Sequence, residues 1–308
     1  MNVEKEMSQR MHTEFYKQRH FARNAFWLKC LLAALLWGSP AMAGTVDDLR
    51  KQAEQGIVEA QYNLSVAYVT GDGVQTNWVE ALNWGRKAAD QGYALAQYNL
   101  GVAYTQGDGV KKDPIEAAKW YEKAAAQGLV LAQYNLGMML LKGQGIPTDL
   151  PRAFALLSKA SDQGHASAQR NLGMMYMNGD TVPRNPAKAV ELFRKSAEQG
   201  LAEAQYNLAV AYTFGDGIKK DWAQALSLYQ KAADQGLPDA QNNLGAMYIE
   251  GNGVRKDPVE AYKWFTLALK GGCAGATRGQ EKAADEMSAD QIQKAKRLAE
   301  EFKPKKSL

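Results

Sequence analysis

Small and apolar residues recur along most of the chain at the spacing of one face of an α-helix. Ala96, Leu100 and Tyr104 follow one another at intervals of four residues, and Ala117 and Tyr121 repeat that interval further on. Such stripes are typical of amphipathic helices that bury one side. The pattern predicts two helices within residues 93–128, joined by a short connection.

The connection carries residues that end one helix and begin the next. Gly107-Asp108-Gly109 predicts a sharp turn, because glycine adopts left-handed backbone conformations without strain. Asp113-Pro114 predicts a helix start, where Asp accepts hydrogen bonds from free N–H groups and Pro needs no donor. Glu116 is expected to reach back to this cap as in a capping box. We therefore expect a helical hairpin that ends at Gly128.

This hairpin pattern occurs six times. The pentapeptide Ala-Gln-Tyr-Asn-Leu or a variant of it begins every 36 residues, at Ala60, Ala96, Ala132, Ala168, Ala204 and Ala240. One hairpin buries too little apolar surface to offset the entropy of ordering it, whereas stacked hairpins share their apolar faces. We therefore predict an all-α solenoid of six units, over residues 57–92, 93–128, 129–164, 165–200, 201–236 and 237–272.

Segments on both sides of the repeats are expected to close the ends of this stack. Residues 44–56 resemble an isolated second helix and end in the same Gln-Gly as the repeats. Beyond Gly272 the pattern predicts two more helices, over 276–287 and 288–302. Because terminal units of a solenoid need a polar outer face, we interpret 44–56 as an N-terminal capping helix and 273–308 as C-terminal capping helices with a basic tail.

Residues 1–43 have the three-part layout of a secretory signal peptide. Basic residues precede a short apolar run, and the small residues Ala41-Met42-Ala43 predict cleavage after Ala43. The run is shorter than the roughly 20 residues that span a bilayer, so we expect no membrane insertion after cleavage. We therefore expect a periplasmic or secreted protein. An uncleaved tether, and a true start at Met7 or Met11, stay open.

Charge and cysteine content argue against strong nucleic-acid binding and against an internal disulfide bond. Without residues 1–43, 31 basic residues face 30 acidic ones, so no strong electrostatic footprint for nucleic acid remains. Cys273 is then the one remaining cysteine, so no internal disulfide can form and stability must come from packing.

Chemistry-bearing residues are sparse beyond residue 43. His165 is the one histidine there and lies far along the chain from Cys273, so we expect no zinc site and interpret His165 as an exposed loop residue. The Gly71-Asp72-Gly73 loop and its copies lack the Lys-Ser/Thr of a phosphate-binding loop, and one Asp per loop is too few for calcium. We predict no catalytic residues, no cofactor and no metal ion.

The residues of 96–128 carry a family resemblance. The run Ala-Gln-Tyr-Asn-Leu-Gly-x-x-Tyr, then Gly-Asp-Gly-Val, then Asp-Pro-x-x-Ala-x-x-Trp-Tyr-x-Lys-Ala-Ala-x-Gln-Gly resembles the Sel1-like repeat, a relative of the tetratricopeptide repeat. The resemblance implies a right-handed superhelix that binds another protein, here in an exported bacterial member. Some cysteine-rich members are linked to β-lactam binding or hydrolysis, but the chain has no Ser-x-x-Lys, Ser-Asp-Asn or Lys-Thr-Gly.

By resemblance to tetratricopeptide units, a partner protein or peptide is expected on the concave face of the first helices. One position of that face is occupied, from the first to the last copy, by Tyr62, Tyr98, Tyr134, Arg170, Tyr206 and Asn242. Tyrosine supplies contact area at low entropic cost, although these rings can equally pack against the next hairpin. The third and fourth copies add flexible apolar side chains, Met138, Leu141, Met174 and Met177, which favour a central apolar groove.

The Gln and Asn of every pentapeptide are interpreted as structural, bonding backbone groups at the junctions between units. The leading hypothesis is therefore a non-enzymatic interaction scaffold in the bacterial envelope. There are two alternatives. One is an enzyme that acts on β-lactams or cell-wall material, and the other is a cytoplasmic signalling adaptor that retains residues 1–43. The partner and the oligomeric state are not predicted.

Overall fold

The computed structural model describes residues 45–305, and the signal peptide predicted for 1–43 lies outside them. Within the described residues the secondary structure is helical throughout. Each repeat contributes a first helix and a second helix of 13 residues each. The first helices are α4 (Val58–Thr70), α6 (Ala94–Gln106), α8 (Val130–Lys142), α10 (Ala166–Asn178), α12 (Ala202–Phe214) and α14 (Pro238–Glu250). The second helices are α5 (Trp78–Asp90), α7 (Pro114–Ala126), α9 (Leu150–Asp162), α11 (Pro186–Glu198), α13 (Trp222–Asp234) and α15 (Pro258–Lys270).

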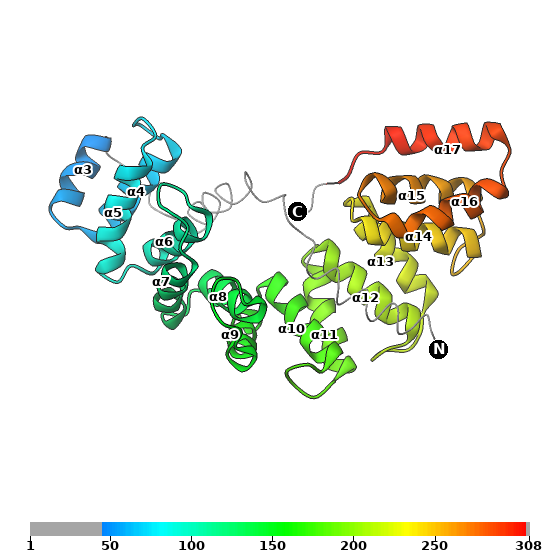
Figure 1. Ribbon diagram of the computed structural model, residues 1–308, viewed down its shortest axis with the longest axis horizontal. Helices are drawn as coiled ribbons and strands as arrows, with labels where there is room; N and C mark the ends of the chain where they lie inside the picture. Colours follow the sequence, from blue (N-terminus) through cyan, green and yellow to red (C-terminus); the bar gives the residue numbers. More distant parts are fainter. Residues whose placement is uncertain (1–44, 306–308) are drawn as a thin grey trace.

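The helices stack in chain order along a curved path. Each packs mainly against the helix before it and the helix after it, and Figure 1 shows the chain following an arc from α4 to α15. In the middle of the arc α8 lies on its inner side and α9 on its outer side. The predicted α-solenoid is therefore confirmed.

The turns and helix starts follow the sequence signals with one exception. Gly107 ends α6 with φ 83°, and its N–H donates to Ala103 O at 2.7 Å. The Asp113 carboxylate accepts from the N–H groups of Ile115 and Glu116, each at 3.0 Å. The Glu116 side chain does not complete a capping box, because it pairs instead with Lys119 Nζ at 2.9 Å. Helix α7 therefore begins with a single side-chain cap.

Small residues let the two helices of a hairpin approach closely. A Cβ atom added at Gly101 would lie 2.6 Å from the Tyr121 ring, so this glycine on α6 leaves room for the aromatic side chain of α7. Ala117 and Ala124 on the same face of α7 are fully buried. Large rings on one helix thus fit against small residues on its neighbour.

A ladder of glutamines joins each repeat to the next. Gln97 is buried and donates to Ala89 O of the preceding second helix at 3.1 Å. Its Oε1 accepts from Gln127 Nε2 at 2.8 Å, and Gln127 also donates to Gly92 O at 2.9 Å. The same Gln–Gln bond recurs at one pair before this one and at three pairs after it, and the structural interpretation of the pentapeptide Gln is confirmed.

The pentapeptide Asn has a different partner from the one predicted. Asn135 and Asn171 each place their amide nitrogen 3.5 Å from the hydroxyl of Tyr98 and Tyr134 respectively, one repeat earlier. Asn243 donates to the hydroxyl of Tyr229 at 3.2 Å. The role at the junction is structural, but these three amides bond tyrosine side chains instead of backbone groups.

Additional helices outside the repeats cover both ends of the stack. Helix α3 (Val46–Glu54) packs against α4. After the 3-10 helix η1 (Ala274–Ala276), α16 (Thr277–Asp285) and α17 (Ala289–Glu301) pack against α15. Phe302, directly after α17, places its ring edge-on to Trp264 at 5.5 Å between centroids. No helix between residues 45 and 305 is long and apolar enough to cross a bilayer.

Candidate partner-binding surfaces

The tyrosines predicted to contact a partner lie at the seam between successive first helices. The Tyr62 ring lies 4.9 Å from the ring of Tyr93, which precedes α6. The Tyr134 ring stacks on His165, which precedes α10, at 4.4 Å. These two rings therefore bridge their own first helix and the start of the next one, whereas Tyr98 and Tyr206 contact Tyr121 and Tyr229 on the second helix of their own repeat.

Burial divides the predicted residues into two groups. Tyr98, Tyr62 and Met174 are only 2%, 9% and 7% exposed, so they belong to the packed interior and offer a partner little area. The other predicted residues are half-buried, namely Tyr134, Met138, Leu141, Arg170, Met177, Tyr206 and Asn242. The accessible part of the seam is therefore concentrated on α8, α10 and α12.

His165 is half-buried, contrary to the expectation of an exposed loop residue. Its Nδ1 accepts from Ala168 N at 3.2 Å and so caps α10. Together with the contact to Tyr134, this bond makes the side chain part of the junction between the third and fourth repeats.

Two basic side chains lie among the apolar and aromatic ones at this seam. Arg170 occupies the position of a tyrosine in four other copies, and its Nη1 donates to Asn171 Oδ1 at 3.1 Å. Burial lowers the pKa of Arg170, and the nearby Glu203 carboxylate acts in the opposite direction. Burial also lowers the pKa of Lys142, and the charge of Arg170 lowers it further. The centre of the seam therefore holds two basic side chains, Arg170 and Lys142, with the Glu203 carboxylate near Arg170.

Lys142 was not among the predicted residues, although the repeat alignment contains a signal for it. The five equivalent residues of the other copies are Thr70, Gln106, Asn178, Phe214 and Glu250, so Lys142 is the one basic residue at that position. Its proximity to Arg170 arises where side chains of α8 and α10 meet across the junction between two repeats, which the alignment alone does not show.

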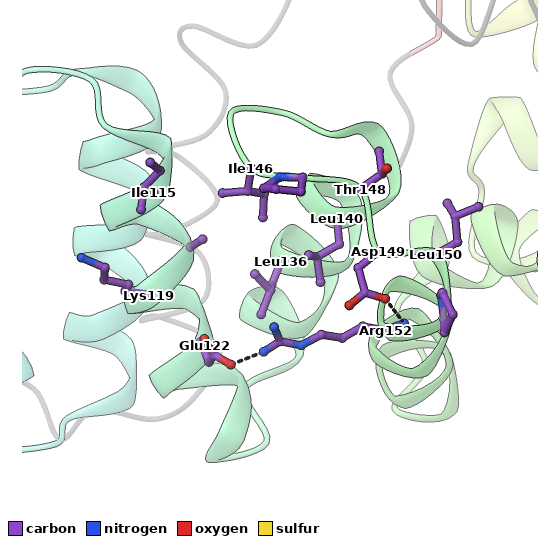
Figure 2. Close-up of a pocket in the computed structure, with 13 residues that line it drawn as sticks. Ile115, Lys119, Glu122, Leu136, Leu140, Ile146, Thr148, Asp149, Leu150 and Arg152 are labelled. Carbon is purple, nitrogen blue, oxygen red and sulfur yellow. Dashed lines mark hydrogen bonds and ion pairs between the residues drawn. The ribbon is translucent and has the colours of Figure 1, made fainter.

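A second concave feature lies beside α7, away from the predicted residues. Figure 2 shows Leu136 and Leu140 at the base of a pocket between α7 and the loop that leads to α9. The pocket has a volume of about 650 Å³, within the range of small-ligand and side-chain sites. Glu122 and Arg152 form an ion pair across one end of it. Sequence reasoning did not find this pocket.

The described residues show no grouping that suggests bound metal. Between residues 45 and 305 no three His, Cys, Asp or Glu side chains are placed to share a metal ion. Cys273 Sγ lies 3.6 Å from Asp239 Oδ1, in the loop after α15.

A curved stack of equivalent hairpins with an accessible central seam defines the class of helical-repeat proteins. Within this class the chain belongs to the Sel1 repeat family, because the family model matches residues 58–93, 94–129, 130–165, 166–201, 202–237 and 238–273. Sel1 repeat proteins are generally protein-interaction scaffolds and not enzymes. The matched segments begin one residue after the units defined from the sequence pattern.

Two solved structures are similar to the chain. A protective antigen of uropathogenic Escherichia coli strains that displays an SLR fold is 35% identical, with a TM-score of 0.77 over 83% of this chain. The match covers 55% of the antigen, so the chain spans about half its length. A Sel1 repeat protein from Oxalobacter formigenes is also 35% identical, with a TM-score of 0.63 over 70% of this chain and 86% of that one. No curated protein matches the chain.

Proposed function

We propose that the protein is a non-enzymatic scaffold of the bacterial envelope that holds a partner polypeptide on the inner seam of the solenoid. The observation that carries this proposal is the accessible, chemically distinct centre of the seam. There the half-buried Tyr134 and Met138 of α8 lie together, and Arg170 of the neighbouring α10 lies close to Tyr134. An apolar and aromatic surface with two basic side chains at its centre fits a partner segment that carries both apolar and acidic side chains.

The proposed location rests on the sequence of residues 1–43. Basic residues, a short apolar run and Ala41-Met42-Ala43 occur in the order of a secretory signal. Relatives with solved structures come from bacteria, where such a signal directs a chain across the inner membrane. We expect the exported chain to begin at Gly44.

Site-specific photo-crosslinking in the native host tests the proposed binding surface. A photoreactive residue at Met177 should give a discrete adduct with a partner, because this position lies at the accessible part of the seam. The matched control places the same residue at Val79, which is 63% exposed on the second helix α5. Equal adduct patterns at Met177 and Val79, or none at either, would contradict the proposal.

Fractionation of the same cells tests the location. N-terminal sequencing of the periplasmic or secreted protein should begin at Gly44. Recovery of the chain in the cytoplasm with residues 1–43 intact would overturn the envelope assignment and leave the crosslinking result to be judged separately.

A further inference from the structure

The first and third repeats each have a groove beside the first helix and its turn, against the helix that precedes the repeat. In the first two repeats an Arg–Tyr pair joins that preceding helix to the first helix. Arg50 Nη2 of α3 donates to the hydroxyl of Tyr68 at 3.1 Å. Arg86 of α5 donates to the hydroxyl of Tyr104 and lies 5.9 Å from its ring centre. In both repeats the chain's own tyrosine occupies the space between the helices.

The third repeat lacks this pair. The tyrosine position is occupied by Leu140, whereas the other five copies have Tyr68, Tyr104, Tyr176, Tyr212 and Tyr248. The position of Arg50 and Arg86 is occupied by Glu122. Glu122 turns toward the start of α9 and pairs with Arg152. The third repeat therefore loses both the ring and its hydrogen-bonding partner.

The pocket of Figure 2 lies at this position. The equivalent groove of the first repeat, lined by Arg50, Tyr68 and residues 74–77, has a volume of about 410 Å³. The volume in the third repeat is about 650 Å³. The larger space coincides with the replacement of an aromatic ring by a leucine side chain.

The pocket has the lining of a side-chain binding site. Leu136, Leu140 and Ile146 make its base apolar, and the Glu122–Arg152 pair supplies polar atoms at one end. Ile115 lines the pocket from α7 and is 58% exposed, which makes it one of the most exposed large apolar side chains between residues 45 and 305. Apolar contact area thus continues from the pocket onto the surface.

We propose that this pocket receives an aromatic side chain, tyrosine or phenylalanine, from a partner polypeptide. The incoming ring takes the place that the chain's own tyrosine takes in the first two repeats, and a tyrosine hydroxyl reaches the Glu122–Arg152 pair. The proposal rests on the scaffold function, but its surface lies beside α7 and is distinct from the inner seam. The third repeat thereby becomes a specific anchor point in an otherwise regular stack.

The experiment titrates N-acetyltyrosinamide into the full-length chain and follows the Ile115 and Ile146 methyl groups by NMR. Both signals should shift and saturate. The double variant Glu122→Arg/Leu140→Tyr restores the residues of the first two repeats and should bind roughly tenfold more weakly or not at all, because its own ring fills the space. Met177→Ser, on the inner seam, should bind like the wild type.

A second variant keeps the test decisive if the double variant does not fold. Ile115→Ser changes an exposed residue and should weaken binding, read from Ile146, without changing the melting temperature. The proposal is overturned if N-acetyltyrosinamide causes no shift. It is also overturned if the folded double variant or Ile115→Ser binds as tightly as the wild type, or if N-acetylleucinamide binds as tightly as N-acetyltyrosinamide. Phe214 is 52% exposed and could itself supply a ring. Self-association that Phe214→Ala abolishes would therefore also overturn the proposal, since the ring would then come from a second copy of this chain and not from a different partner protein. None of these results alters the crosslinking expected at Met177.

Discussion

Gln97 shows how one side chain couples two junctions of the stack. It donates to Ala89 O and accepts from Gln127, and it is only 5% exposed. Gln97→Ala removes both of these hydrogen bonds, although Ala89 O still accepts from Gly92 N and Gln127 still donates to Gly92 O. Two lost hydrogen bonds predict a loss of about 2 kcal/mol of unfolding free energy. Urea unfolding measures this change. Gln224→Ala, on the exposed face of α13, is the control and should change stability by under about 0.5 kcal/mol.

Glu191 on α11 allows a test of surface electrostatics. Hydrogen bonds from Lys195 and Lys188 lower the pKa of this carboxyl from 4.5 to about 2. Because the folded pKa lies below the unfolded one, the ion pairs stabilise the protein above pH 4.5, and this contribution is lost as the pH falls toward 2. Side-chain NMR titration should give a pKa near 2, and Lys195→Met should raise it. A midpoint near 4.5 in the wild type would contradict the paired geometry.

At the scale of helices, the start of α7 is stabilised by the N-cap residue Asp113, and aspartate occupies this position in several other repeats. Asp113 accepts two backbone N–H groups, and no capping box supports it. Asp113→Ala should therefore reduce the unfolding free energy by about 1 kcal/mol, while Asp113→Asn should retain most of it. Thermal unfolding of both variants measures the difference. Equal losses in the two variants would show that charge at the helix start matters more than the cap.

Most elements follow from the sequence because every copy repeats the same signals. Glycine at the turn, Asp or Asn before the second helix and the four-residue spacing of small residues predict the hairpins within a few residues of their observed bounds. The exposure of individual side chains is less predictable. The spacing of residues along a helix shows which face a side chain lies on, but not which neighbouring side chain covers it. Tyr98 is buried against Tyr121, whereas the equivalent Tyr134 is half-buried against His165. The pocket escaped prediction because it depends on how Leu140 and Glu122 meet across two repeats.

At the scale of the whole molecule, stability is shared between neighbouring units and not stored in one core. Clusters of buried side chains follow one another along the stack, and each draws on adjacent helices. A solenoid of this kind is described by the stability of each unit and of each junction. The number of repeats can therefore change without loss of the fold, provided that the junctions stay in register.

Deletion of one whole unit tests this description. Removing residues 165–200 joins Gly164 to Leu201 and places α12 where α10 packed on α9. Gln205 then meets Ser161 O, the partner of Gln169 in the wild type at 3.3 Å, so the glutamine ladder stays continuous. We expect a folded chain with helical circular dichroism and one cooperative, lower melting transition. Removing only residues 165–182 deletes α10 and leaves α9 facing α11, so the alternation of first and second helices is broken and this half-unit variant should unfold or aggregate. Equal stability of the two deletions would show that the junctions do not set the register of the stack.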